Sequence, residues 1–227
     1  MKDKILIVLG ILQTLVLITI LIVLISYGNA IRPKQVKAHM EPHTIEQEPI
    51  KLNEKDPIWG SNDAEYTLVA YIDYECPFCK DMYKNIKELE EEYIRTGKVK
   101  IVFRDLPLRM HEHARTIAHA AECARQAGKY WEFADMALAN TEPYSEELLK
   151  SWAENLDLEL EMCIEDVTIK DVILEDLRNA RTRRLRGTPA IFINDEYYRG
   201  TIPASDLRLI FEGKKPVKRR SGVCNQP

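Results

Sequence analysis

Two cysteines separated by two residues, Cys76-Pro77-Phe78-Cys79, stand at a junction between two different hydrophobic patterns. Before them, the continuous apolar and β-branched run 67–72 predicts a buried strand. After them, apolar residues recur at helical spacing from Phe78 to Tyr93 with charged residues between them, which predicts an amphipathic helix. Pro77 then falls in the first helical turn, where it forfeits no helical hydrogen bond. The chain must therefore place both thiols where a strand leads into the N-terminus of a helix.

This position has a chemical consequence for the thiols. Unpaired N–H groups and the positive end of the helix dipole stabilise a thiolate, so we expect the pKa of Cys76 to lie below the ordinary value of about 8.5. Cys76 is expected to be the more exposed, attacking thiol and Cys79 the resolving thiol. A half zinc site or two inert core cysteines are the alternatives. A structural zinc site needs a second ligand pair, whereas the other three cysteines are scattered singly, so redox chemistry without a metal is favoured.

Residues 5–25 form an apolar run without a charged residue. As a helix this run would span about 30 Å, the thickness of the hydrocarbon core of a bilayer. A cleaved signal peptide is the alternative, since Gly28-Asn29-Ala30 offers small residues for cleavage, but its apolar region would be only about 7–15 residues long. We therefore expect residues 1–30 to be an uncleaved transmembrane signal anchor, with residues 5–25 in the membrane.

Basic residues flank the apolar run on both sides, so the positive-inside rule does not decide its orientation. Five cysteines with a C-x-x-C pair are more useful in an oxidising compartment, which favours a single-pass plasma-membrane protein with an extracytoplasmic catalytic domain. Residues 31–56 are polar, contain three prolines and predict a flexible stalk. Residues 57–213 suit one domain, and 214–227 form a basic tail. The 32 basic and 36 acidic residues give no sign of nucleic-acid binding.

The hydrophobic patterns within residues 57–213 predict an α/β order of elements. A second strand is expected at 99–103, and strand character returns at 190–193 and 197–198 before a last helix at 203–211. Between these strands, helices are expected at 113–127, 130–139, 146–156 and 168–184. The plan is therefore strand–helix–strand, a helical insertion at about 107–186, and then strand–strand–helix.

Four motifs together resemble the DsbA-like thiol–disulfide oxidoreductases. They are Asp73-Tyr74-Glu75-Cys76-Pro77-Phe78-Cys79, Phe103-Arg104-Asp105-Leu106-Pro107-Leu108 with 111–114, residues 120–124 with 128–131, and Gly187-Thr188-Pro189-Ala190-Ile191-Phe192-Ile193-Asn194. The resemblance covers about residues 56–213 and implies a thioredoxin-like α/β fold with an inserted helical subdomain. It also implies disulfide exchange at Cys76 and Cys79 that needs no bound cofactor.

The resemblance assigns a role to the loop before the strand at 190–193. In the family the proline of this loop is cis and faces the active-site disulfide, so Thr188–Pro189 is expected to be a cis peptide bond. The backbone of Thr188 would then bind an extended substrate, as a strand adds to the edge of a sheet. The substrates would be exported proteins with free thiols, and a membrane redox partner would regenerate the disulfide.

One position departs from the family pattern. Members of the fold often carry a buried acidic residue six positions before the first cysteine, where it helps to move a proton to or from the buried thiol; here that position is Ala70. Asp73 is the nearest substitute for proton handling, but it can equally serve as a loop residue that makes a turn hydrogen bond. His111, His113 and His119 are interpreted as non-catalytic, because the resemblance gives them no role and thiol exchange needs no metal.

The remaining cysteines predict a structural bond. Cys123 and Cys163 lie on segments of the insertion whose apolar neighbours point inward, so we expect a disulfide between them. Two buried free thiols are the alternative, since cysteine packs well as a small hydrophobe. An oxidising location favours the bond, which would leave Cys224 as an odd thiol in a Gly- and Asn-flanked tail.

The sequence as a whole predicts an extracytoplasmic thiol–disulfide oxidoreductase that introduces disulfide bonds into exported proteins through Cys76 and Cys79. Two alternatives stay open. A disulfide reductase or isomerase would use the same thiols, since the direction of exchange depends on the reduction potential. A non-catalytic binding or chaperone module would keep the fold with an unreactive disulfide, and the reactivity of Cys76 separates that module from an enzyme.

Overall fold

The computed structural model describes residues 17–20, 48–160, 163, 166–216 and 222–225. The chain divides into two compact units, Met1–Glu46 and Gln47–Pro227, and only the helical residues 17–20 of the first unit are described. Apart from residues 17–20, the predicted membrane span at 5–25 lies outside the described residues, as does most of the predicted stalk. Among the residues that are described, no helix combines the length and the apolar character needed to cross a membrane.

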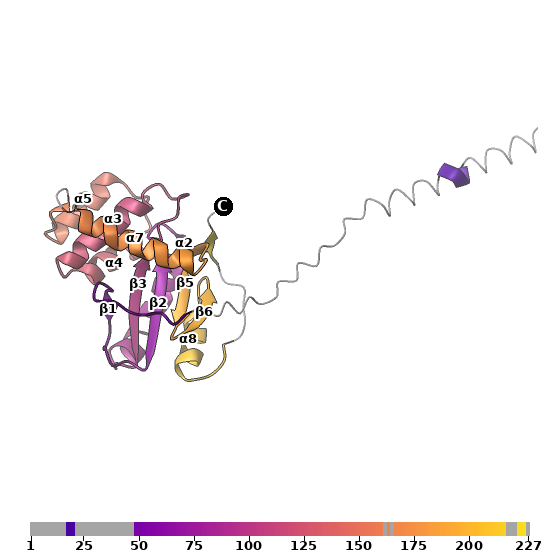
Figure 1. Ribbon diagram of the computed structural model, residues 1–227, viewed down its shortest axis with the longest axis horizontal. Coiled ribbons are helices and arrows are strands. Elements are labelled where there is room, and N and C mark those ends of the chain that lie inside the picture. Colours follow the sequence, from indigo (N-terminus) through magenta and orange to yellow (C-terminus); the bar gives the residue numbers. More distant parts are fainter. Residues whose placement is uncertain (1–16, 21–47, 161–162, 164–165, 217–221, 226–227) are drawn as a thin grey trace, which may run out of the picture. The chain divides into compact units, whose positions relative to one another are not determined.

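A five-stranded sheet forms the centre of the second unit, in the order β1-β3-β2-β5-β6 (Figure 1). The central strands β2 and β3 run parallel, and the other neighbouring strands are antiparallel. Because parallel strands need a crossover connection, the helix that follows the C-x-x-C pair is part of the link between β2 and β3. The strands of this sheet are β1 (Ile58–Trp59), β2 (Tyr66–Ile72), β3 (Val99–Asp105), β5 (Ala190–Ile193) and β6 (Glu196–Arg199).

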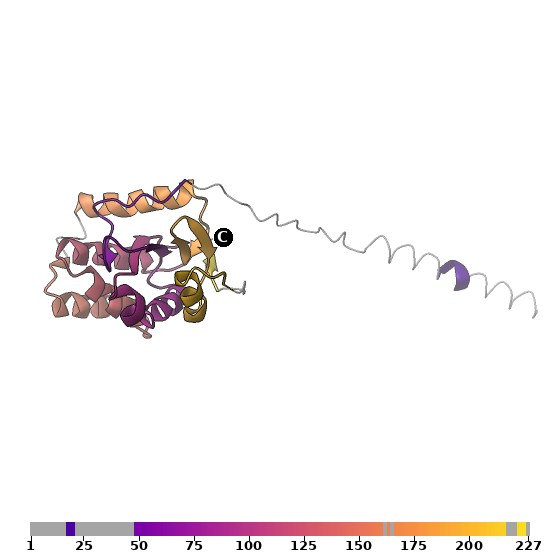
Figure 2. The same cartoon turned by 90° about the horizontal axis from the view of Figure 1, so that it is seen from below.

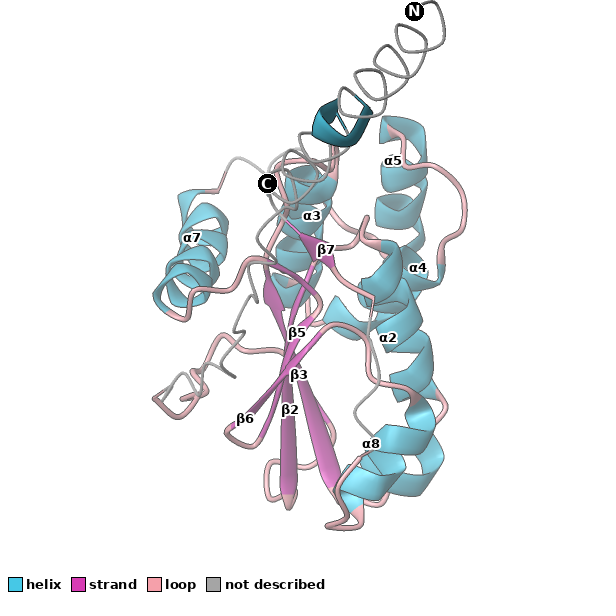
Figure 3. Cartoon of the chain, turned by 90° about the vertical axis from the view of Figure 1, so that its right-hand side faces the viewer, coloured by secondary structure: helices cyan, strands magenta, loops and turns pink. Residues whose placement is uncertain are grey.

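Helices cover both faces of this sheet. Seen edge-on, α7 lies on one face and α2 with α8 on the other (Figures 2 and 3). Between β3 and the next strand the chain forms a run of helices, so the predicted α/β fold with a helical insertion is confirmed. The helices are α2 (Pro77–Lys87), α3 (Ala114–Gln126), α4 (Tyr130–Ala139), α5 (Glu146–Asn155), α7 (Val167–Thr182) and α8 (Ala204–Phe211).

The helix starts follow from local capping. Ser145 accepts a hydrogen bond of 3.2 Å from the Leu148 backbone N–H and caps α5, as its sequence pattern predicts. The prediction that α7 begins at Thr168 is one residue late, because the helix begins at Val167 with Asp166 as its N-cap. Its carboxylate accepts from both the backbone N–H and the hydroxyl of Thr168, each at 2.8 Å, so Thr168 is a donor to the cap.

The helix predicted from Phe78 to Tyr93 is not continuous. Regular α-helix ends with α2 at Lys87, and a π-helical turn, η1, follows at Glu90–Ile94, closed by a 2.9 Å hydrogen bond from Arg95 N to Glu90 O. The consecutive residues Tyr93 and Ile94 are both buried. Both side chains therefore belong to the core, although the regular α-helix has ended before them.

The boundary between stalk and domain also differs from the prediction at residue 56. The buried Arg104 side chain donates to Lys51 O at 2.8 Å and to both carboxylate oxygens of Asp56, at 2.9 and 2.8 Å. Ile50 and Leu52 are partly buried against the core. The described residues of the predicted stalk therefore belong to the folded domain, because they supply acceptors that the buried guanidinium of Arg104 needs.

Cys123 and Cys163 form a disulfide, with their Cα atoms 5.8 Å apart and 40 residues apart in sequence. Cys123 lies on α3, and it packs with Ile169 and Ile173 of α7 in a small apolar cluster. The bond therefore reinforces the contact between two helices of the insertion.

Candidate active site

Cys76 and Cys79 lie at the N-terminus of α2. Cys76 is the N-cap residue, and its carbonyl oxygen accepts from Cys79 N at 3.0 Å and from Lys80 N at 3.2 Å. Pro77 begins the helix, and the first turn contains no acidic residue that would neutralise the positive end of the helix dipole. Both thiols are free, so the structure represents the reduced site.

The surroundings lower the pKa of Cys76 to about 5. The largest cause is the hydrogen bond between the Cys79 thiol and the Cys76 sulfur; the hydrogen bond from Cys224 acts in the same direction, while burial opposes them. Burial raises the pKa of Cys79 well above its ordinary value. The direction for Cys76 is the one predicted from the helix terminus, but a neighbouring thiol is the main cause. The reduced site thus holds a Cys76 thiolate and a protonated Cys79 that donates to it.

Cys76 is not the exposed thiol that the sequence led us to expect. Its relative exposure is 0%, against 1% for Cys79. A short strand near the C-terminus, β7 (Cys224–Asn225), pairs with β4 (Gly187–Thr188) beside it. The sequence analysis assigned this segment to the basic tail. The feature that could have indicated a role for it is the odd cysteine, Cys224, which the fold brings to the active site.

The loop at Thr188–Pro189 also lies beside the thiols. Its peptide bond is cis, and Thr188 is completely buried. The carbonyl oxygen of Thr188 lies 3.4 Å from Cys76 Sγ, within reach of a thiol hydrogen bond. The structure therefore brings together three of the predicted site residues, Cys76, Cys79 and Thr188, with Cys224 as an unforeseen fourth.

The Asp73 carboxylate faces a neighbouring loop. One oxygen accepts from Glu75 N at 2.8 Å, and the other accepts from Leu108 N at 2.7 Å and lies 2.8 Å from His111 Nδ1. The contact with the thiols comes from the backbone, since Asp73 N lies 3.5 Å from Cys79 Sγ. Asp73 thus makes the turn hydrogen bond that was one of its two predicted roles, and it joins the cysteine loop to the loop at 108–111.

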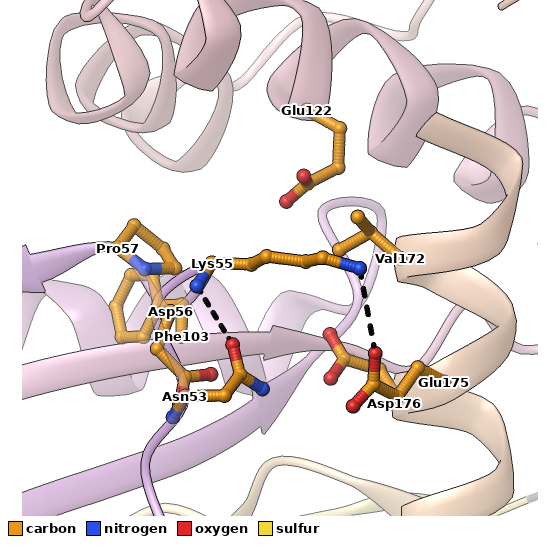
Figure 4. A pocket seen from close by; sticks show the side chains of 9 residues that line it. All are labelled: Asn53, Lys55, Asp56, Pro57, Phe103, Glu122, Val172, Glu175 and Asp176. Atoms are coloured by element: carbon orange, nitrogen blue, oxygen red, sulfur yellow. Dashed lines mark hydrogen bonds and ion pairs between the residues drawn. The ribbon is translucent and has the colours of Figure 1, made fainter. Parts of the chain in front are cut away.

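A second group of perturbed residues lies in the insertion and the sheet: Asp105, Glu122 and Asp176, here called the carboxyl cluster. All three are buried, and Asp105 N donates to Asp176 at 2.8 Å. Glu122 lies 2.5 Å from Arg125, and Figure 4 shows Glu122 and Asp176 at a pocket that the Lys55 side chain crosses. Within the described part of the chain, no three His, Cys, Asp or Glu residues are arranged to hold a metal ion.

Burial is the largest cause of the raised pKa values in the carboxyl cluster. It raises the pKa of Asp176 to about 7 and that of Glu122 above its ordinary value. Burial and the nearby charges of Glu122 and Asp176 raise the pKa of Asp105 well above the ordinary value. Both Asp105 carboxyl oxygens are buried without a hydrogen-bond partner among the described residues, so this side chain is held in the neutral form.

Residues 52–212 match a family model described as thioredoxin. A stretch of 151 residues is 33% identical to the Na(+)/H(+) antiporter NhaA 3 of Salinispora tropica and covers 65% of this chain and 23% of that protein. A stretch of 190 residues is 32% identical to the Na(+)/H(+) antiporter NhaA 1 of Salinispora arenicola and covers 77% of this chain and 29% of that protein. The chain therefore spans less than a third of the length of these curated relatives.

Solved structures share the fold. A thioredoxin-like oxidoreductase from Silicibacter pomeroyi aligns with a TM-score of 0.64 at 24% identity, covering 71% of this chain and 92% of that one. The thiol-disulfide exchange protein alpha-DsbA2 from Wolbachia pipientis aligns with a TM-score of 0.63 at 25% identity, covering 71% and 88%. Oxidised BdbD from Bacillus subtilis aligns with a TM-score of 0.62 at 22% identity, covering 70% and 92%. The chain thus has a thioredoxin-like fold with DsbA-like structural neighbours.

Proposed function

The chain belongs to the thioredoxin family, and we propose that it is a thiol–disulfide oxidoreductase that introduces disulfide bonds into client proteins through Cys76 and Cys79. One observation carries the proposal. Cys79 and Cys76 are hydrogen-bonded at the N-terminus of α2, in surroundings that lower the pKa of Cys76 to about 5 and raise that of Cys79 by burial. One sulfur is thus prepared to be a stable thiolate and the other to keep its proton.

The oxidising reaction follows from this pair. A client thiolate attacks Cys76 Sγ of the Cys76–Cys79 disulfide, a mixed disulfide forms, and Cys79 leaves and takes up a proton. A second client thiolate then attacks the client sulfur of the mixed disulfide, and Cys76 leaves as a thiolate. The client loses two electrons and forms its disulfide, while the enzyme gains them as one thiolate and one thiol.

The low pKa of Cys76 supports the oxidising direction. A leaving thiolate of low pKa leaves faster, and a stabilised reduced form makes the disulfide a stronger oxidant. A reductase would instead require a Cys76–Cys79 disulfide that is more stable than the client disulfide. Renewed turnover needs another protein to reoxidise the two thiols.

Redox titration tests the proposal. The reduced protein is equilibrated in glutathione buffers of graded ratio, free thiols are alkylated in acid, and the fraction of Cys76–Cys79 disulfide is measured by peptide mass mapping. We expect a potential above that of the glutathione pool, in the range of known disulfide oxidants. A potential well below glutathione would identify a reductase, and a disulfide that does not equilibrate would identify a non-catalytic module.

A trapping experiment tests the assignment of the two thiols. Cys79→Ser combined with Cys224→Ser removes both thiols that contact Cys76, so mixed disulfides with client proteins should accumulate through Cys76. The control is the triple variant that also carries Cys76→Ser, which should trap none. Adducts that run through any other cysteine would contradict the assignment.

We also propose that residues 5–25 anchor the protein in the plasma membrane with the domain on the outer face, where exported clients and a membrane redox partner would meet it. The support is the uncharged apolar run of 21 residues ahead of a polar segment with three prolines. Protease added to intact protoplasts should digest the domain. A domain that is digested only after lysis would show that it lies on the cytoplasmic side. A domain recovered in the soluble fraction would show that residues 5–25 do not anchor it.

A further inference from the structure

The edge of β4, where the sequence predicts that a client strand binds, is already occupied. Residues Gly187 and Thr188 pair antiparallel with Asn225 and Cys224 of β7, in the register Gly187↔Asn225 and Thr188↔Cys224. A strand that adds to this edge is the arrangement expected for an extended client. Here the added strand comes from the protein's own C-terminal segment.

Two glycines fit this segment closely to the active site. A Cβ atom on Gly222 would lie 2.1 Å from the ring of Phe78, which belongs to the C-x-x-C pair. A Cβ atom on Gly187 would lie 2.1 Å from Cys224 O. Real Cβ contacts are not this short, so both positions require glycine for the segment to dock.

Polar contacts hold the segment at both ends. Gly222 O accepts from Thr201 N at 3.0 Å, and the Thr201 hydroxyl donates to Phe78 O at 2.9 Å. At the other end the Arg199 side chain donates to Asn225 Oδ1. The segment is therefore attached to β6 through Arg199 and to Thr201, in addition to β4, and Thr201 in turn binds the C-x-x-C loop.

The register brings a third sulfur to the redox pair. Cys224 lies opposite Thr188, whose carbonyl oxygen is 3.4 Å from Cys76 Sγ, and Cys224 is itself 8% exposed. The Cys224 and Cys76 side chains are hydrogen-bonded to each other. Burial, followed by this contact with Cys76, raises the pKa of Cys224 to about 12, so Cys224 is a protonated donor to the Cys76 thiolate.

We propose that residues 222–225 are a built-in client strand and that Cys224 is a third redox-active thiol, which forms a disulfide with Cys76 in exchange for the Cys76–Cys79 bond. This inference rests on the proposed function, because it uses the reactivity of Cys76. In the oxidised protein, Cys224 attacks Cys76 Sγ, the Cys76–Cys79 bond breaks, and the proton of Cys224 passes to Cys79. The number of disulfides is unchanged, so the step needs no external oxidant or reductant.

The exchange would affect how client proteins reach Cys76. A client strand and the segment compete for the same edge of β4, and the segment covers Cys76 until it is displaced. We therefore expect the Cys76–Cys224 form to be a protected state of the oxidised enzyme that opens when a client takes the edge.

Peptide mapping in a Cys79→Ser background tests the third thiol directly. The reduced variant is treated with oxidised glutathione, free thiols are alkylated in acid, and the disulfides of Cys76 are identified without reduction. Cys76 first forms a mixed disulfide with glutathione, and Cys224 should displace the glutathione to give Cys76–Cys224 as the main product. Adding Cys224→Ser should leave the Cys76–glutathione adduct in place.

A matched pair of variants tests whether docking of the segment is required. Gly222→Val keeps every cysteine but cannot fit against Phe78, whereas Val223→Ala changes the adjacent residue without that clash. Gly222→Val in the Cys79→Ser background should shift the product several-fold towards the glutathione adduct, and Val223→Ala should not. With Cys79 present, Gly222→Val should also speed the attack of reduced glutathione on the Cys76–Cys79 disulfide several-fold.

The outcomes separate the two proposals. A Cys76–glutathione adduct that persists in Cys79→Ser with the segment intact overturns the third thiol and leaves the proposed function standing. Equal yields of Cys76–Cys224 in Gly222→Val and Val223→Ala overturn the docked strand. A Cys76 that does not react with oxidised glutathione even in Gly222→Val overturns the proposed function, and the inference with it.

Discussion

The thiol site, Cys76 with Cys79, Thr188 and Cys224, and the carboxyl cluster both bury ionisable groups, yet the shifts go in opposite directions. Around Cys76 the thiols of Cys79 and Cys224 can donate hydrogen bonds to the sulfur, and its pKa falls to about 5. Around the carboxyl cluster the acids lie near one another, Asp105 has no donor among the described residues, and the pKa values rise. Burial alone therefore does not make a reactive anion, because the sign of the shift is set by the donors that accompany the burial.

The largest expected difference between the two regions is in disulfide exchange. Cys76→Ser should abolish the oxidation of a dithiol peptide, because it removes the sulfur that the client thiolate attacks. Asp176→Asn should leave the rate within about twofold, because Asp176 contacts β3 and not the thiols. The measurement is the initial rate with a fluorescent dithiol peptide. The comparison breaks if Asp176→Asn slows exchange as strongly as Cys76→Ser.

The titration of Cys76 sharpens the comparison at the thiol site. The reduced protein should gain thiolate absorbance near 240 nm with a midpoint at about pH 5, and Cys76→Ser should lose that transition. Because this pKa lies below its unfolded value of about 8.5, the stabilisation of the reduced fold is complete above pH 8.5 and is lost as the pH falls through about 5. A midpoint at pH 8 or above would show that the donors around Cys76 do not act on it.

The disulfide Cys123–Cys163 tests whether the two regions are independent. It supports the contact of α3 with α7, the helices that carry Glu122 and Asp176. Replacing both cysteines by Ala should lower the free energy of unfolding by about 4 kcal/mol in the chain-entropy model for a loop of this length. Chemical denaturation measures the loss, and the titration midpoint of Cys76 should not move. A shifted midpoint would show that the insertion controls the thiol site.

Asp176→Asn should produce the smallest effect, in the pH dependence of stability. The pKa of Asp176 is raised to about 7, so its stabilising contribution is present below the unfolded value of about 3.9 and is lost as the pH rises through about 7. The variant lacks this loss and should be more stable than the wild type at pH 8, with little difference at pH 4. The measurement is the free energy of unfolding of the variant and the wild type in urea at both pH values. A variant that is less stable at pH 8 would show that the carboxylate is held by its contacts with Arg104 and Asp105.

Much of the fold could be predicted from local sequence patterns. The strand before Cys76 and the helices of the insertion were predicted within a few residues, because hydrophobic periodicity and caps such as Ser145 act over one or two turns. The π-helical turn at Glu90–Ile94 was missed because it lies within the apolar pattern from Phe78 to Tyr93, which predicts one continuous helix.

The sequence by itself determined that two thiols lie at the junction of a buried strand and a helix, because both neighbouring patterns are local. Only the tertiary structure decided which groups surround those thiols. The pairing of Thr188 with Cys224 joins two-residue strands, which are too short to give a periodic pattern in the sequence. The burial of the Asp105 carboxyl without a hydrogen-bond partner among the described residues likewise has no local sequence pattern. The charge of a buried sulfur or carboxyl depends on donors a few ångströms away, and those donors come from parts of the chain that only folding brings near.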